Sequence, residues 1–120
     1  MGMFTLTARA DSFALYGATS SGHGELYVLN PATGGASQDV GPLNDVNALN
    51  YSTTGLAFDP TTDVLYGSTS GVSGTKLLTI NPNTGFVTVV GSFAQGNITM
   101  TDLAFDSSGN VVSVNSTGVG

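Results

Sequence analysis

The sequence of 120 residues has no cysteine and no tryptophan, only two cationic side chains and a single histidine. Without cysteine the chain can form neither a disulfide nor a thiolate site. Two basic residues against eight carboxylates give a formal net charge of −6, so the chain has no basic patch and nucleic acid is not expected as a partner. No apolar run approaches the roughly 18 residues of a membrane-spanning helix, so no membrane insertion is expected.

The chain also lacks helical patterning and the marks of an export signal. No window of about ten residues carries an apolar period near 3.6 without a glycine or proline, so we expect little or no helix. Its first residues have neither the basic region nor the apolar run of a signal peptide. The charge-poor composition, with 17 glycines, nevertheless favours an extracellular or cell-surface setting.

What the chain has instead is internal repetition. Three motifs return at offsets of 47, 50 and 51 residues: GLAFDP at 55–60 as DLAFDS at 102–107, LYGATS at 15–20 as LYGSTS at 65–70, and LNPATG at 29–34 as INPNTG at 80–85. Such a period indicates a propeller, solenoid or array of similar units. We therefore predict one β-repeat domain over residues 1–120, with repeat 1 at about 4–45, repeat 2 at about 51–95 and half of repeat 3 at about 99–116.

Each repeat is predicted to contain four short strands. In the second repeat, period-two alternation and flanking turn signals predict strands at 54–58, 64–69, 76–81 and 86–90. The first repeat has counterparts at 6–9, 13–19, 25–30 and, weakly patterned, 35–40, whereas the third stops after 101–105 and 111–115. We expect an all-β fold of about two and a half four-stranded units, built as antiparallel meanders.

The motifs LAFDP at 56–60, LYG at 65–67, LTINPNTG at 78–85 and VVG at 89–91 resemble the blade repeat of exported bacterial β-propeller proteins. The resemblance covers nearly all of residues 5–115. It implies propeller-type blades and a secreted or surface module, of bacterial origin, without catalytic residues. Because propellers close with four to eight blades, two and a half blades leave open sheet edges that have to be covered.

No catalytic, cofactor or metal site is expected. His23 is the only histidine, and we interpret it as an exposed loop residue. Asp59 and Asp63 flank one predicted turn, and Asp102 and Asp106 flank the next repeat's first strand; turn capping is a better explanation for them than a calcium site. Without tryptophan, a glycosidase cleft with aromatic platforms is not favoured either.

Two interaction functions remain as hypotheses. The first is a non-catalytic extracellular structural module that pairs with other copies of itself through open sheet edges, as a ring or a fibre. The residues that we expect at these edges are Phe4, Leu6, Leu103, Phe105, Val112 and Val114. The alternative is a lectin-like module that binds glycans through recurring tyrosines, namely Tyr16, Tyr66 and Tyr27. Packing of these rings between sheets is the competing interpretation.

Residues 86–90 (FVTVV) have a further property of interest. They contain β-branched and aromatic side chains but neither charge nor proline, as segments that form cross-β contacts do. Inside a closed unit they would form an ordinary strand, whereas on an uncovered edge they would recruit another chain.

Overall fold

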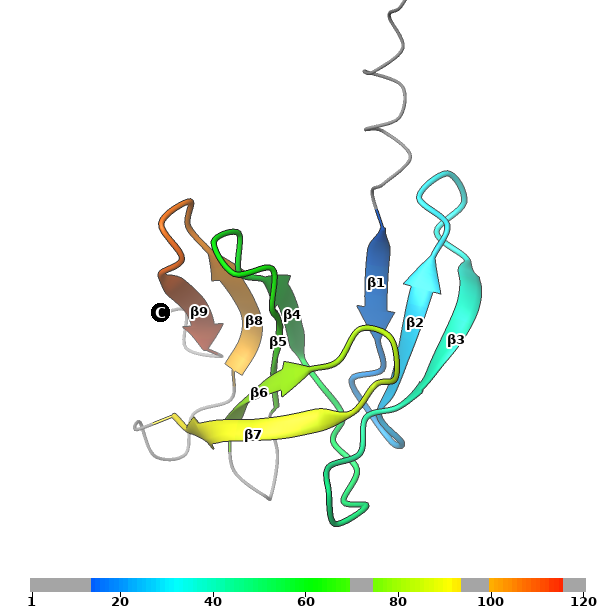
Figure 1. The fold of residues 1–120 in the computed structure, drawn as a ribbon, viewed down its shortest axis with the longest axis horizontal. Helices are drawn as coiled ribbons and strands as arrows, with labels where there is room; N and C mark the ends of the chain where they lie inside the picture. Colours follow the sequence, from blue (N-terminus) through cyan, green and yellow to red (C-terminus); the bar gives the residue numbers. More distant parts are fainter. Residues whose placement is uncertain (1–13, 70–74, 94–99, 116–120) are drawn as a thin grey trace, which may run out of the picture.

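The computed structural model describes residues 14–69, 75–93 and 100–115, with only the backbone of 114 and 115 (Figure 1). These residues form strands and turns without a helix. The strands are β1 (Leu15–Ala18), β2 (Glu25–Leu29), β3 (Ala36–Pro42), β4 (Gly55–Phe58), β5 (Leu65–Ser68), β6 (Lys76–Ile80), β7 (Val87–Ser92), β8 (Met100–Phe105) and β9 (Val111–Asn115). No helix that could cross a membrane occurs in this described part of the chain.

The strands form three antiparallel sheets, each of them a simple meander. The N-terminal sheet has the order β1-β2-β3, the central sheet β4-β5-β6-β7, and the C-terminal sheet β8-β9. Leu15 lies opposite Leu29 in the N-terminal sheet, just as Leu65 lies opposite Ile80 in the central sheet. The predicted all-β class and antiparallel pairing are confirmed, whereas none of these sheets closes on itself.

Only the central sheet shows four strands among the described residues. Its strands lie within a residue or two of the predicted positions. The strand expected at 6–9 falls outside the described residues. Residues 35–40, predicted to be a weak strand, contribute to the seven-residue β3, whose pairing with β2 has two register shifts. Ladder hydrogen bonds to β2 therefore hold a strand that its own side-chain pattern only weakly specifies.

The hairpin turns between β2 and β3 and between β6 and β7 are built in the same way. Asn30 Oδ1 accepts a hydrogen bond from the N–H of Ala32 at 2.8 Å, and Asn81 Oδ1 accepts one from the N–H of Asn83 at 2.9 Å. The glycine that ends each motif has a φ of 75° or 82°, a conformation that other residues adopt only with strain. The two NPxTG motifs therefore specify these turns locally.

The main hydrophobic core lies between the N-terminal and central sheets. Leu26 from β2 packs with Leu65, Leu78 and Ile80 of the central sheet, and all four are at most 3% exposed. Alternate residues of a strand point to opposite faces, so the three central residues share the face turned to the N-terminal sheet. Full burial of each aliphatic side chain contributes about 1.5–3 kcal/mol, and this contact accordingly holds the two sheets together.

The linker, residues 43–53, connects these two sheets and hydrogen-bonds to both. The N–H of Leu43 donates to the carbonyl of Gly24 in the N-terminal sheet region at 2.9 Å. On the side of the central sheet, the N–H of Val87 at the start of β7 donates to the carbonyl of Asn44 at 2.9 Å. Leu43 and Tyr51 also add their side chains to the core. We call the packed contact between two successive sheets a joint. The linker is therefore part of the first joint, between the N-terminal and central sheets.

The C-terminal sheet packs on the other face of the central sheet, where β8 lies beside β4 (Figure 1). A Cβ atom on Gly55 would lie 2.7 Å from the backbone nitrogen of Leu103, so the two strands approach at a separation that only glycine permits. Thr54 Oγ1 donates to the carbonyl of Met100 at 2.6 Å. Leu103 and Met100 are 3% and 5% exposed, and they fill this second joint.

Candidate functional site

The described residues hold no cluster of three or more metal-ligating side chains. A surface depression of about 540 Å³ lies where the end of β3 meets the turn between β6 and β7. Its lining consists of Pro42, Asn44, Asn81, Thr84 and Phe86. None of these five side chains can serve as a general acid or base near neutral pH.

A second depression, of about 300 Å³, contains one carboxylate, Asp45. Asp45 Oδ1 accepts hydrogen bonds from the N–H groups of Asn47 and Leu49 at 2.9 and 3.0 Å, and Oδ2 accepts one from Tyr51 Oη at 2.9 Å. The hydrogen bond from the N–H of Leu49 is the main reason why the pKa of Asp45 is lowered. The pKa of Tyr51 is raised, first by burial of its hydroxyl and then by the hydrogen bond to Asp45 and the charge of that carboxylate. Both carboxylate oxygens are thus engaged in fixing the linker.

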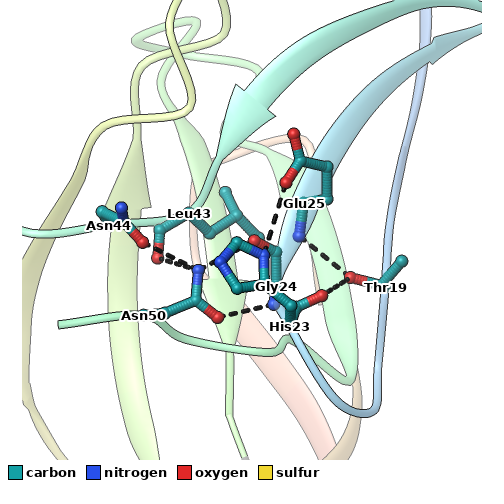
Figure 2. A network of polar contacts seen from close by, with 7 residues as sticks. All are labelled: Thr19, His23, Gly24, Glu25, Leu43, Asn44 and Asn50. Atoms are coloured by element: carbon teal, nitrogen blue, oxygen red, sulfur yellow. Dashed lines mark hydrogen bonds and ion pairs between the residues drawn. The ribbon is translucent and has the colours of Figure 1, made fainter. Parts of the chain in front are cut away.

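The only histidine belongs to a polar network between the β1–β2 turn and the linker (Figure 2). His23 is 65% exposed, as expected for a loop residue, and its Nδ1 lies 3.5 Å from Glu25 Oε2. Thr19 Oγ1 donates to the carbonyl of His23 and accepts from the N–H of Glu25. The side-chain amide of Asn50 both donates to the carbonyl of Gly24 and accepts from its N–H. This network fastens the turn to the linker.

Glu25 forms an acidic pair with Asp39 on the neighbouring strand. Its partial burial, followed by the hydrogen bond and the charge of Asp39, raises the pKa of Glu25, and His23 opposes that shift. The two acidic side chains therefore lie close together on one side of the N-terminal sheet.

Asp59 and Asp106 occupy equivalent hairpin turns. Asp59 Oδ1 accepts hydrogen bonds from the N–H and the hydroxyl of Thr61, both at 2.8 Å. Asp106 Oδ1 accepts from the N–H groups of Ser108 and Asn110, both at 2.9 Å. These contacts lower the pKa of each carboxyl, chiefly through the N–H of Thr61 for Asp59 and the side chain of Asn110 for Asp106. Both aspartates cap turns, in agreement with the sequence interpretation.

The three tyrosines proposed for glycan binding do not meet in one pocket. The ring centroid of Tyr16 lies 5.7 Å from that of Phe58, and the centroid of Tyr66 lies 5.2 Å from that of Phe105. Each pair joins one sheet to the next, so these rings pack between sheets. Tyr27 alternates with the core residues of β2 and is half-buried on the opposite side of the N-terminal sheet.

We define the N-terminal face as the side of the N-terminal sheet turned away from the central sheet. Because alternate residues point to opposite sides and Leu26 faces the core, this face includes Leu15, Glu25, Tyr27, Leu29 and Asp39. Leu15 is 38% exposed, whereas Leu65, the leucine of the other LYG motif, is 1% exposed. The N-terminal sheet lies over Leu65, and none of the described strands lies over Leu15.

We define the C-terminal face as the side of the C-terminal sheet turned away from the central sheet, with the described side chains of Asp102, Ala104 and Val112. Val112 is 54% exposed. Ala104 pairs with Val112 across β8 and β9, as Ala57 pairs with Tyr66 across β4 and β5. Val112 therefore stands where Tyr66 stands, but the described residues place no aromatic ring against it.

The residues predicted at open edges have different surroundings. Leu103 is buried, and Phe105 is half-buried against Tyr66, so both side chains already serve the joint inside the chain. Val112 alone of the described side chains in that set lies on a free face. The remaining three predicted positions lie outside the described side chains: Phe4, Leu6 and Val114.

Another exposed apolar surface follows β7, the edge strand of the central sheet. Phe86 and Val90 are 46% and 56% exposed. The linker residues Val46 and Leu49 are 81% and 58% exposed, and sequence reasoning missed both. The bond from Val87 to Asn44 occupies one end of this edge. Val46 stands between Asp45 and Asn47 and Leu49 between Ala48 and Asn50, so no alternating pattern indicated that these two side chains would be exposed.

No family model matches this chain, and neither the curated proteins nor the solved structures that were compared with it give a match. The function is therefore inferred from the geometry of the chain itself.

Proposed function

We propose that this chain is a non-catalytic structural and interaction module, exported by a bacterium, whose copies associate through the open faces and edges of their sheets. The sheets act as propeller-type blades, and the assembly is a ring or a fibre. The blade arrangement is supported by the order of the strands and by the tyrosine–phenylalanine contact that recurs at both joints.

The observation that carries this proposal is the size of the C-terminal sheet within the described residues. The described part of this sheet has two strands, whereas that of the central sheet, which begins with the same LAFD motif, has four. In the central sheet, β6 covers the edge of β5, whereas within the described residues β9 has no strand beyond it. An uncovered edge next to a face that exposes Val112 is a pairing surface for another chain.

Light scattering coupled to size-exclusion chromatography tests the proposal directly. We expect a mass that is a multiple of 12.1 kDa and that falls on dilution. Electron microscopy of the same fractions then separates rings from fibres. A folded protein that stays monomeric at high micromolar concentration would refute self-association.

Glycan binding is the second candidate function, and Tyr27 is the residue that favours it. Its ring lies on the N-terminal face beside the polar side chains of Glu25 and Asp39. A sugar ring can stack on the tyrosine while its hydroxyl groups hydrogen-bond to the two carboxylates. A glycan array comparing the wild-type protein with Tyr27→Ala distinguishes the two functions. Binding that disappears in the variant would support this alternative, and an empty array would argue against it.

A further inference from the structure

We propose, building on the self-association above, that copies assemble head to tail: the C-terminal face of one molecule sits on the N-terminal face of the next. The contact repeats the two joints inside the chain, and those joints show which side of a sheet receives its neighbour.

Both internal joints bring together the same two kinds of face. In the first, Tyr16 of the N-terminal sheet meets Phe58 of the central sheet with an interplanar angle of 60°. In the second, Tyr66 of the central sheet meets Phe105 of the C-terminal sheet at 51°. Each tyrosine belongs to an LYG motif and each phenylalanine to the LAFD motif of the following sheet. The direction of stacking is therefore the same at both joints.

The N-terminal face has the register of a receiving face. In the central sheet, Leu65 and Ile80 pair across β5 and β6 on the side that receives the N-terminal sheet, and they are 1% and 3% exposed. Leu15 and Leu29 pair in the same way across β1 and β2. They lie on the N-terminal face without a described sheet over them, and Leu15 is 38% exposed. A second copy would supply the missing cover.

The C-terminal face has the register of an inserting face. Ala104 and Val112 pair as Ala57 and Tyr66 do, and that central pair lies on the side that packs on the next sheet. Val112 is 54% exposed because the described chain has no fourth sheet to meet it. Each molecule thus carries one receiving face and one inserting face.

Two different faces make the contact heterologous, so it propagates into a ring or an open fibre and does not stop at a symmetric dimer. Both faces are acidic: Glu25 and Asp39 lie on the N-terminal face and Asp102 on the C-terminal face. Exposed like charges repel one another less as salt is added. The assembly is therefore expected to tighten as the ionic strength rises.

A complementation experiment tests the direction of assembly. Leu15→Asp blocks the N-terminal face and Val112→Asp blocks the C-terminal face, each at an exposed position. Each variant alone is expected to lose self-association by at least about 30-fold in dissociation constant. An equimolar mixture keeps one intact face of each kind, and it should form a heterodimer of twice the 12.1 kDa chain mass by light scattering.

Val46→Asp is the matched control, because Val46 is exposed but lies on the linker, away from both faces; this variant should assemble like the wild type. Circular dichroism verifies that each variant folds. If an Asp variant does not fold, the single Ser variant at the same position, Leu15→Ser or Val112→Ser, takes its place. If the wild type associates but the mixture stays monomeric, the head-to-tail inference is overturned while self-association stands. A monomeric wild type would overturn both.

Discussion

Two leucines in identical motifs should differ sharply in what they contribute to stability. Leu65 and Leu15 each open an LYG motif and each pair with an aliphatic residue on the next strand. Leu65 is 1% exposed and belongs to the core, whereas Leu15 is 38% exposed on the N-terminal face. Replacing each with alanine removes the same atoms from two different environments.

The expected magnitudes follow from burial. Leucine to alanine deletes three carbons, worth about 2.4 kcal/mol at about 0.8 kcal/mol per buried methylene. At Leu65 the cavity that remains adds to this loss, and we expect about 3–4 kcal/mol in total. At Leu15 about three-fifths of the transfer term applies and no closed cavity forms, so we expect about 1.5 kcal/mol. The difference of about 2 kcal/mol is roughly a 30-fold change in the unfolding equilibrium.

Urea unfolding monitored by far-UV circular dichroism measures both losses, at a protein concentration low enough to keep the chain monomeric. Leu49→Ala, on the exposed part of the linker, controls for the loss of an exposed leucine. Equal losses at Leu15 and Leu65 would show that both faces are covered alike, and would refute the assignment of the N-terminal face as open. Repeating the titration at high concentration should increase the penalty at Leu15 alone, because assembly buries it.

Two further predictions concern the close strand contact and the acidic pair. Gly55→Ala should lower the free energy of unfolding by about 1–3 kcal/mol in thermal unfolding, because its Cβ would lie 2.7 Å from the nitrogen of Leu103. Gly91→Ala is the control and should be nearly neutral, because a Cβ there meets open space. Equal effects would contradict the close approach of β4 and β8. Glu25→Gln should be more stable than the wild type at pH 8, because the raised pKa of Glu25 means that the folded state penalises its ionised form. This penalty disappears as the pH falls below the ordinary value of 4.5. The curves of stability against pH for the two proteins should therefore converge at low pH. A gap that does not change with pH would exclude that cause.

The local structure of the central sheet was largely predictable from the sequence. Alternating residues around Leu78 and Val87 and the NPxTG turn between them carry information that acts over a few residues only, and the strands form where it indicates. The same holds for Asp59, whose side chain is placed by the neighbouring N–H of Thr61. The turn-capping interpretation needed no knowledge of the rest of the chain.

The covering of each face was not predictable, because it depends on residues distant in the sequence. Leu15 and Leu65 are both followed by Tyr-Gly, yet among the described residues only Leu65 has another sheet over it. We expected Leu103 and Phe105 at an open edge because the third repeat stops after two predicted strands. The central sheet, whose Tyr66 lies about 40 residues earlier, already packs on their side of β8. Alternation shows that a strand has two faces and does not identify which of them is free.

The linker, residues 43–53, sets the angle at which one sheet follows another. It is bonded to the N-terminal sheet through Leu43 and to the central sheet through Asn44, so the tilt between these sheets is fixed within the chain. In an assembly that repeats this joint, any change in tilt is multiplied by the number of molecules. Curvature, and hence the diameter of a ring or the pitch of a fibre, would then be tuned by the length of this segment without any change in the contacting faces.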